Sequence, residues 1–210
     1  MGAGGGDERW LAYARKMIDK IAKQGKSVSG IVRIESALPL GKGMGSSTAL
    51  IVAMCRCLLG PNCAKIAFSL ENELNPGHSG IDFAVIWSGK PVVFQKGSSP
   101  MPVTIDLSFM ESATLIDTGT PTEATPALVA WVKEKYAAEL KQTIEAIVTI
   151  GQCTERILAG EPLKEVMRDH HRAQVMLGVV PEDAQKITAE IEAGGGAAKI
   201  IGAGGRTGGG

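Results

Sequence analysis

Apolar and polar positions alternate at helical spacing over much of the chain. Between Asp7 and Lys23 the apolar residues recur every three or four positions and predict an amphipathic helix. The run STALIVAMCRCLL, residues 47–59, is apolar almost all round, which predicts a helix that is buried on most of its faces. The same spacing predicts further helical segments over residues 62–74, 125–158, 162–177 and 181–193.

Runs rich in β-branched residues or in alternating polarity predict strands between these helices. The expected strands cover residues 29–39, 82–87, 91–96, 112–119 and 197–201. Residues 88–90 would join the second and third of them as a hairpin-like turn. Because the strands come early and the helices late, the pattern predicts an α+β fold.

The composition narrows the classes of protein that fit this pattern. Of the 210 residues, 44% are hydrophobic, which is enough to bury a sizeable core. Lys plus Arg equals Asp plus Glu, 22 of each, which argues against a nucleic-acid binder with a basic surface. No apolar run is long enough to span a bilayer, and residues 1–10 lack a signal-type segment, so a cytoplasmic protein is expected.

The four cysteines do not follow a metal-binding pattern. Cys55, Cys57 and Cys63 lie close together without paired C-x-x-C spacing, and Cys153 stands alone. Buried, reduced thiols are therefore the expected state of these residues.

The densest chemical signal is PLGKGMGSSTAL, residues 39–50. Glycines alternate at Gly41, Gly43 and Gly45, and Ser46 and Ser47 then open the apolar helix. The spacing fits neither the Walker loop nor the dinucleotide fingerprint. Bare backbone N–H groups at a helix N-terminus still favour a phosphate, and a serine hydroxyl there suits magnesium. The alternative is a glycine turn with Ser46 as an ordinary N-cap.

This stretch resembles the second signature of the GHMP kinases, P-x-x-x-G-L-G-S-S-A. The matching residues are Pro39, Gly43, Gly45, Ser46 and Ser47, while Met44 replaces Leu and Thr48 replaces Ala. In that superfamily the loop wraps the phosphates of ATP, and a serine of the pair contacts magnesium. The resemblance therefore implies ATP and Mg²⁺ as cofactors, with Ser47 at the metal. The implied ATP-phosphate loop consists of Gly41, Lys42, Gly43, Met44, Gly45, Ser46 and Ser47.

The segment ENELNPGHSGID, residues 71–82, carries a second resemblance. It is similar to E-x-x-x-H-G-x-P-S-G-x-D of the mevalonate kinases, with Asn75 in place of His and His78 in place of Pro. The resemblance implies that Glu71 coordinates magnesium and that Asp82 is catalytic, beside the attacking hydroxyl. Phosphoryl transfer needs these two roles, a metal-holding carboxylate and a group that orients the alcohol. The alternative is that Glu71 is a solvated helix charge and that Asp82 caps the next segment.

The end of the chain, AKIIGAGGRTGGG, resembles the third signature, K-L-T-G-A-G-G-G-G-C. Arg206 replaces a glycine and would either neutralise phosphate charge or block a close backbone approach. A weaker likeness in ATPALVAWV places Thr125 near the substrate. The alternative for the terminal run is a flexible tail. The substrate pocket implied by these likenesses consists of Thr125, Gly202, Ala203, Gly204 and Gly205.

The resemblances extend over residues 30–205 and imply a GHMP kinase-like α+β fold. Residues 1–110 would form a partial ribosomal-protein-S5-like sheet with helices, and residues 111–210 a helical and sheet-containing C-terminal domain. The implied reaction is ATP-dependent phosphorylation of a primary alcohol, with mevalonate as the first candidate and isoprenoid precursor synthesis as the role. The expected partner is a small-molecule alcohol, and neither nucleic acid nor membrane is expected.

By the same resemblance the chain is short at both ends. Only 38 residues precede Pro39, whereas the family places a lysine-containing first signature well upstream. An uncovered sheet would favour self-association, with a homodimer as the candidate state. Two alternative functions remain open: a non-catalytic, oligomeric module that binds a nucleotide or metabolite, and a kinase for another alcohol or a sugar.

Overall fold

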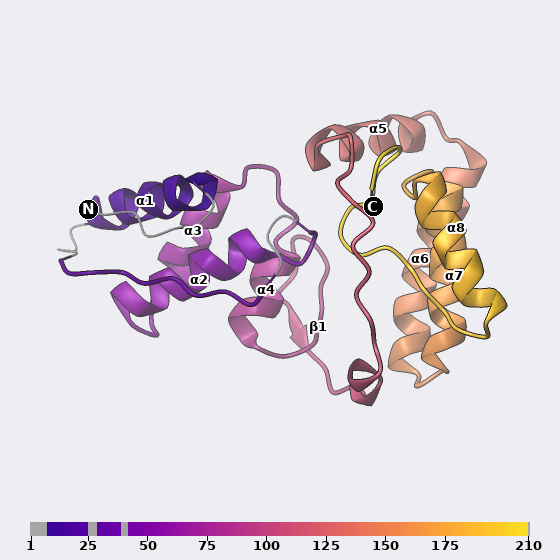
Figure 1. The fold of residues 1–210 in the computed structure, drawn as a ribbon, viewed down its shortest axis with the longest axis horizontal. Coiled ribbons are helices and arrows are strands. Elements are labelled where there is room, and N and C mark those ends of the chain that lie inside the picture. The colour runs from indigo at the N-terminus through magenta and orange to yellow at the C-terminus, as the bar shows by residue number, and fades with distance from the viewer. Residues whose placement is uncertain (1–7, 25–28, 39–41, 210) are drawn as a thin grey trace. The chain divides into compact units, whose positions relative to one another are not determined.

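The computed structural model describes residues 8–24, 29–38 and 42–209, which form two compact units (Figure 1). The first unit consists of residues 8–24, 29–38 and 45–104, and the second of residues 42–44 and 105–209. The glycine-rich stretch is therefore divided, since its residues 42–44 pack with the second unit and its residues from 45 onward with the first.

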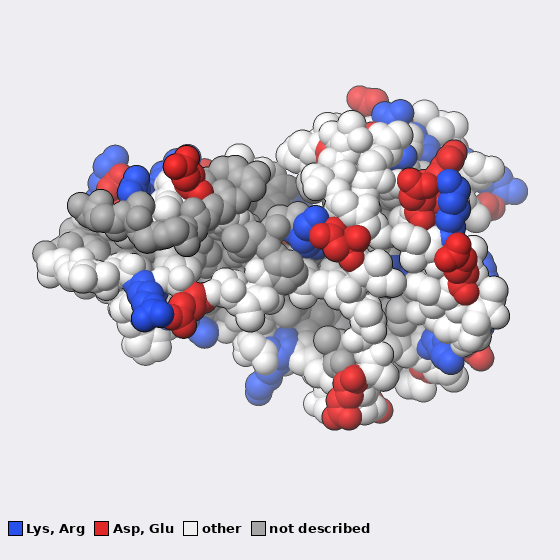
Figure 2. All heavy atoms as spheres, viewed as in Figure 1, with Lys and Arg blue, Asp and Glu red and all other residues white. Residues whose placement is uncertain are grey.

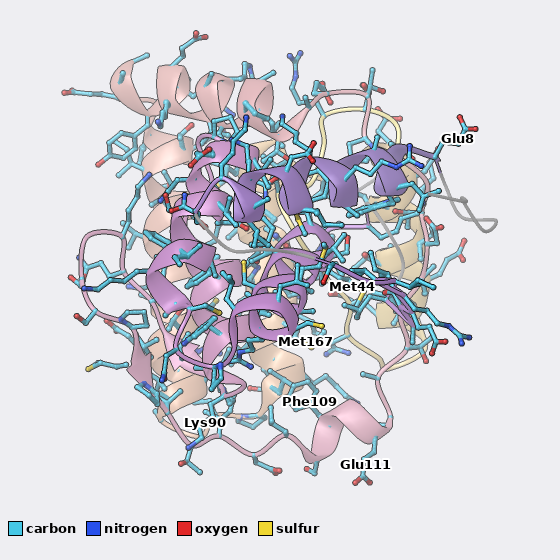
Figure 3. The ribbon with its side chains drawn as sticks, turned by 90° about the vertical axis from the view of Figure 1, so that its left-hand side faces the viewer. Glu8, Met44, Lys90, Phe109, Glu111 and Met167 are labelled. Atoms are coloured by element: carbon cyan, nitrogen blue, oxygen red, sulfur yellow. The ribbon has the colours of Figure 1, made fainter. Side chains whose placement is uncertain are left out.

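The first unit is built mainly from helices. Those described are α1 (Glu8–Ala22), α2 (Ser46–Leu59), α3 (Ala64–Leu74) and α4 (Ile81–Ser88). Two short antiparallel strands follow, β1 (Val92–Val93) and β2 (Met101–Pro102). Glu8 extends from the first turn of α1 into solvent (Figure 3). Apolar side chains of α1, α2 and α3 form the core, whose buried members include Met17, Ile21, Ile51, Cys55 and Leu70.

In the described part of the second unit, a short 3₁₀ helix, η1 (Ser108–Glu111), precedes four α-helices. Its helices are α5 (Thr125–Ala137), α6 (Lys141–Leu158), α7 (Leu163–Leu177) and α8 (Glu182–Ala193). Helices α6 and α7 follow each other closely in the chain and pack against each other (Figure 1). The core of this unit includes Leu128, Ala146, Ala173, Val180 and Ile200.

The predicted helices are confirmed with small shifts at their ends, but residues 125–158 form two helices rather than one continuous stretch. Glu139, between α5 and α6, has a φ of 51°. This left-handed conformation interrupts a helix of L-residues. The apolar spacing continues on both sides of the break, so the periodicity did not reveal it.

The strand predicted over residues 82–87 is wrong, because these residues lie in α4. Gly80 and Gly89 adopt left-handed conformations at the two ends of this helix, with φ of 95° and 62°. The Gly89 N–H donates to the Val85 carbonyl and closes the helix where a hairpin turn was predicted. A short apolar run does not by itself distinguish a strand from a partly buried helix.

The remaining strand predictions are confirmed only at residues 92–93, within the predicted run 91–96. In the described part of the chain, residues 29–38, 112–119 and 197–201 contain no strand. Ile31 is 98% exposed, so its side chain does not pack as an alternating strand requires. The fold is therefore mostly helical with a small two-stranded sheet, which agrees with α+β but holds less sheet than predicted.

The surface carries charges of both signs, and Figure 2 shows them interspersed on the face drawn. Across the described ranges, no helix has the length and apolar character needed to cross a membrane. Three thiols, Cys55, Cys63 and Cys153, are buried as predicted, whereas Cys57 is exposed on α2. The prediction of a buried thiol at residue 57 is therefore wrong, because this position faces away from the core.

Candidate functional site

The N-terminal end of α2 lies against the first turn of α4. Gly45 precedes α2 with a φ of 64°, a conformation that glycine adopts without strain. A Cβ at this position would lie 3.3 Å from Asp82 Cγ and 3.2 Å from Ile86 Cδ1. The last glycine of the stretch therefore allows Asp82 to approach the start of α2.

Asp82 lies in the first turn of α4, two residues after the left-handed Gly80, and its side chain is exposed. A carboxylate in the first turn of a helix is favoured by the helix dipole. The N-cap residue of α2 is Gly45, which has no side chain, and at the start of α4 the Ile81 N–H donates to Ser79 Oγ at 3.2 Å. The N-terminal end of α2, which begins after a glycine N-cap, therefore provides backbone N–H groups that suit an anion.

Glu71 is a buried carboxylate in the last turn of α3, with 2% of its surface exposed. The Thr48 hydroxyl donates to its Oε1 at 2.8 Å, and the Asn75 amide donates to the same oxygen at 3.0 Å. Its Oε2 has no hydrogen-bond partner among the described residues. Because an unpaired buried carboxylate is costly, this oxygen marks a place where a cation or another donor would fit. The solvated-charge alternative for Glu71 is therefore wrong.

Asn75 connects Glu71 to two further side chains. Its amide nitrogen lies 3.5 Å from Ser47 Oγ, and its amide oxygen accepts a hydrogen bond from the Tyr13 hydroxyl at 3.3 Å. Burial raises the pKa of Tyr13 to about 12, so this hydroxyl remains a donor at neutral pH. One chain of polar contacts therefore joins α1, the start of α2 and the end of α3.

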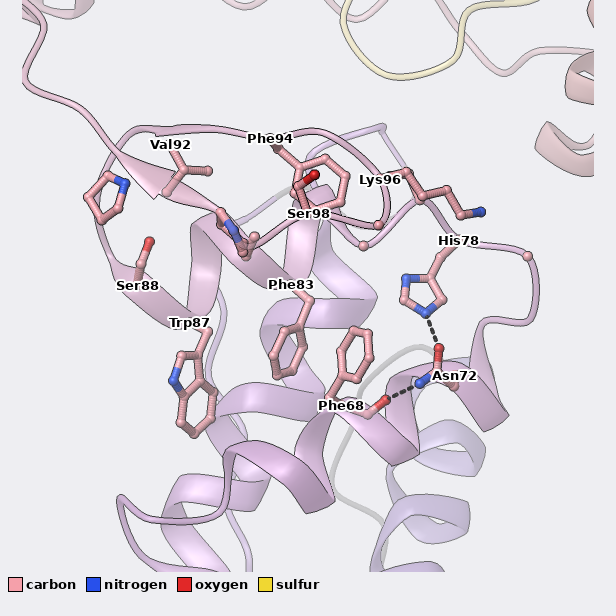
Figure 4. A pocket seen from close by; sticks show the side chains of 17 residues that line it. Phe68, Asn72, His78, Phe83, Trp87, Ser88, Val92, Phe94, Lys96 and Ser98 are labelled. Carbon is pink, nitrogen blue, oxygen red and sulfur yellow. Dashed lines mark hydrogen bonds between the residues drawn. The ribbon is translucent and has the colours of Figure 1, made fainter.

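His78 also lies near Glu71. Its Nδ1 is 4.0 Å from Glu71 Oε1, and its Nε2 is 2.8 Å from the amide oxygen of Asn72 (Figure 4). The imidazole packs edge-on against Phe68, with 5.9 Å between the ring centroids. These contacts hold the imidazole through packing and one hydrogen bond, and they extend the polar cluster around Glu71.

A pocket of about 770 Å³ lies beside His78, lined by α3, α4 and the segment that carries β1 and β2. Phe68, Phe83 and Trp87 line it (Figure 4), and Phe83 stacks on Trp87 with 5.7 Å between the ring centroids. An aromatic lining suits an apolar group rather than a phosphate. The lining also includes the polar side chains of His78, Ser79 and Lys96.

In the second unit, two glycine-rich segments that are distant in sequence approach each other. A Cβ at Gly202 would lie 3.2 Å from Gly43 Cα, and both glycines have positive φ. Lys42, the neighbour of Gly43, donates to Asp117 Oδ1 at 2.8 Å. This hydrogen bond lowers the pKa of the Asp117 carboxyl. The two stretches that resemble GHMP signatures therefore meet at residues 43 and 202, where side chains would separate the two backbones.

The terminal glycine segment packs against other residues of the second unit, to which it belongs. The Gly205 N–H donates to the Val179 carbonyl at 2.9 Å, and the Gly209 N–H donates to the Thr120 carbonyl at 2.9 Å. A Cβ at Gly204 would lie 2.1 Å from the Val179 carbonyl oxygen. The flexible-tail alternative is therefore wrong for the described residues of this segment.

Arg206 is directed toward its own unit. Its guanidinium lies 4.8 Å from the centroid of the Trp131 ring and its Nε 3.7 Å from Glu123 Oε1. Thr125 is the first residue of α5 and is exposed. The charge of Arg206 is therefore balanced by a carboxylate and a ring.

The structure groups the predicted site residues into two sets. In the first unit, Asn75 links Ser47 to Glu71, and Asp82 lies against Gly45. The predicted loop residues Lys42, Gly43 and Met44 belong to the second unit, together with the Gly202 segment. Gly41 lies outside the described residues. Sequence reasoning missed Tyr13, Thr48 and Asn75 as partners of this cluster, although the last two had been noticed as departures from the resembled motifs.

The oxygen ligands offered by Glu71 and Ser47 suit magnesium. The described residues contain no group of three or more His, Cys, Asp or Glu side chains that could hold a metal. Magnesium usually binds through one or two carboxylates together with phosphate and water oxygens. Glu71, with its unpartnered Oε2 and the nearby Ser47 hydroxyl, fits an ion that is shared with phosphates.

Comparisons with known proteins agree with the motif resemblance. Residues 12–90 match the family model of the GHMP kinases N terminal domain. The chain is 29% identical to the mevalonate kinase of Thermococcus sibiricus, over 93% of this chain and 63% of the relative. It is 31% identical to the mevalonate kinase of Thermococcus onnurineus, over 93% of this chain and 64% of the relative.

A more distant relative is matched over a larger share of its length. The mevalonate kinase of Archaeoglobus fulgidus is 24% identical, over 98% of this chain and 73% of the relative. No solved structure matches the chain at a significant level. The chain thus spans less than two thirds of the length of the two Thermococcus relatives.

Proposed function

We propose that this protein, whose residues 12–90 match the family model of the GHMP kinases N terminal domain, transfers the γ-phosphate of ATP to a primary alcohol, with mevalonate as the first candidate. The observation that carries the proposal is the carboxylate of Glu71. It is buried beside the start of α2, and one of its oxygens has no partner among the described residues. A kinase site needs such a carboxylate to hold a divalent cation against phosphate.

Glu71 and Ser47 are the proposed holders of the cation. Both contact Asn75, so their side chains lie on one polar cluster. Bound Mg²⁺ would supply neutralisation of the phosphate charge. The chain itself contributes an oriented carboxylate and a hydroxyl, fixed by helices that pack in one core.

Asp82 is the proposed partner of the alcohol. It lies at the start of α4 against Gly45, so it adjoins the N-terminal end of α2. A carboxylate there would accept a hydrogen bond from the substrate hydroxyl and orient its oxygen toward the phosphate. It would receive the proton of that hydroxyl as the bond to phosphorus forms.

The phosphates are proposed to bind at the backbone N–H groups of Gly45, Ser46 and Ser47. These residues open α2, where the helix dipole favours an anion. Lys42, Gly43 and Met44 complete the proposed loop in sequence. Thr125 and the 202–205 segment remain the proposed substrate-pocket residues of the second unit.

Mevalonate is chosen because the relatives described above are named mevalonate kinases. The chain spans 63% and 64% of the length of the two Thermococcus relatives, so activity of this chain is itself part of the proposal. The competing functions are a module that binds nucleotide or metabolite without turnover, and a kinase for another alcohol or a sugar.

The test is ADP release by the purified chain with ATP and Mg²⁺, with and without mevalonate. We expect stimulation by mevalonate and a loss of about 10²–10⁴-fold in Asp82→Ala, with ATP binding nearly unchanged. Asp183→Ala is the matched control, because Asp183 also lies in the first turn of a helix and forms an ion pair with Lys186. This control should retain full turnover.

Three results would decide against the proposal. ATP binding without stimulation by mevalonate, homoserine or a sugar would favour the non-catalytic module. Stimulation by one of the other acceptors alone would replace mevalonate as the substrate. Equal turnover of Asp82→Ala and Asp183→Ala would remove Asp82 from the reaction.

A further inference from the structure

Two residues that differ from the resembled motifs donate hydrogen bonds to the same oxygen of Glu71. Thr48 stands where the second GHMP signature has Ala, and Asn75 stands where the acidic segment has His. In the fold, the Thr48 hydroxyl and the Asn75 amide both donate to Glu71 Oε1, at 2.8 and 3.0 Å. These side chains come from α2 and from the residue that ends α3.

These contacts make the two oxygens of Glu71 unequal. Oε1 accepts two hydrogen bonds, and His78 Nδ1 lies 4.0 Å from it. Oε2 has no partner among the described residues and is fully buried. A carboxylate held by donors on one oxygen cannot rotate freely, so its other oxygen is presented in a fixed direction.

Asn75 is itself held in one orientation. The Tyr13 hydroxyl donates to its amide oxygen at 3.3 Å, which turns the amide nitrogen toward Glu71 and Ser47. The amide nitrogen thereby lies near both side chains to which the proposed function gives the cation. Tyr13 contributes from α1, an element without a predicted site residue.

We infer that Thr48 and Asn75, supported by Tyr13, are positioning residues that present Glu71 Oε2 to a divalent cation. The inference rests on the proposed function, because it concerns the cation site of the same reaction. A purely structural role would instead be to satisfy a buried carboxylate. The two roles differ in what their loss changes: metal affinity in the first case, and only folding stability in the second.

The test uses Mn²⁺ as the probe, with binding to the full chain followed by electron paramagnetic resonance in the presence of ATP. We expect Thr48→Ala and Asn75→Ala each to weaken Mn²⁺ binding about 10- to 100-fold, the range found for residues that orient metal ligands. Thr48→Ser keeps the hydroxyl and should restore most of the affinity. Tyr13→Phe removes only the supporting hydroxyl, so its loss should be smaller.

Thr143→Ala is the matched control. Thr143 is also a fully buried threonine, but it belongs to α6 of the second unit and is not a hydrogen-bond partner of Glu71. The same deletion of a hydroxyl there should leave Mn²⁺ binding unchanged. Circular dichroism on every variant establishes that it is folded, and Thr48→Ser and Tyr13→Phe keep the test valid if an alanine variant is not.

The outcomes separate this inference from the proposed function. If Glu71→Gln abolishes Mn²⁺ binding while Thr48→Ala and Asn75→Ala bind as the parent chain does, the inference alone is overturned. If Glu71→Gln binds Mn²⁺ as tightly as the parent chain, or the parent chain binds none, the cation site of the proposed function fails and the inference fails with it. Weaker binding in Thr48→Ala that Thr48→Ser does not restore would also contradict the inference.

Discussion

Glu71 in the first unit and Asp169 in the second are both carboxylates on helices, but their partners differ. Asp169 accepts hydrogen bonds from Arg156 at 2.7 Å and from Arg172 at 2.8 Å. The hydrogen bond from Arg156 lowers the pKa of this carboxyl. Glu71 is more deeply buried, yet its hydrogen-bond donors are a hydroxyl and an amide.

The kind of partner indicates the kind of role. Arginine side chains balance the charge of Asp169 within the fold, so this carboxylate does not require a bound cation. Neutral donors orient the charge of Glu71 without balancing it, and the cost of burying it is met only in part. A buried carboxylate with oriented but uncharged donors is therefore a better candidate for binding a cation than one inside an ion-pair network.

The largest expected effect is on turnover, when the charge of Glu71 or of Asp169 is removed by an amide substitution. Glu71→Gln keeps the size of the side chain and should lower Mg²⁺-dependent turnover about 100-fold or more, since several kcal/mol of charge stabilisation is lost. Asp169→Asn should leave turnover unchanged and lower the melting temperature slightly. Turnover over a Mg²⁺ titration and calorimetry measure the two effects. If both variants lost only stability, the distinction between the two carboxylates would fail.

A smaller effect is expected at the glycine that brings Asp82 to α2. Gly45→Ala places a Cβ 3.3 Å from Asp82 Cγ at a φ of 64°, and should lower the free energy of unfolding by about 1–2 kcal/mol. Gly60→Ala is the matched control, because Gly60 has a φ of 83° with nothing within 4 Å of the added Cβ. Gly60 also has a ψ of −179°, a backbone conformation that almost only glycine adopts, so the strain alone should cost about 1–3 kcal/mol.

The two glycine variants should differ more in function than in stability. Gly45→Ala should weaken ATP binding, measured by calorimetry, because the start of α2 and Asp82 would move apart. Gly60→Ala lies at the far end of α2 and should bind ATP as the parent chain does. Equal ATP affinities in the two variants would count against an anion site at Gly45.

The smallest expected effect is the change in the free energy of unfolding when His171 of the second unit is protonated. Burial lowers the pKa of His171, so the unfolded chain binds the proton more readily than the folded one. Stability is therefore kept above the ordinary pKa of about 6.5 and falls as the pH drops below it. Urea unfolding between pH 8 and pH 5 should show this loss, and His171→Phe should reduce it. An unchanged pH dependence in His171→Phe would contradict the assignment.

The helices were predictable from the sequence and most strands were not. Helical periodicity extends over many residues, so a long segment such as 163–177 identifies itself. A strand needs a partner, and the alternating run over residues 29–38 has none that forms a ladder among the described residues. Residues 82–87 are a helix because the left-handed glycines on either side set its ends.

The candidate site was predictable in its residue types but not in its contacts. The spacing between Glu71 and Asp82 and the paired serines carried the resemblance, and the burial of Glu71 supports its assignment. The hydroxyl of Tyr13 gave no signal, because Tyr13 also lies among the apolar positions of α1 that pack on the core. Its role becomes visible only through its contact with Asn75.

The sequence by itself determined the helices, the separation of apolar from polar faces, and the motifs that resemble those of the GHMP kinases, since each depends on neighbours in the chain. Only the tertiary structure decided which oxygen of Glu71 is held and which is presented. That choice depends on donors from α1, α2 and the end of α3, which meet only when the apolar faces of these helices pack together.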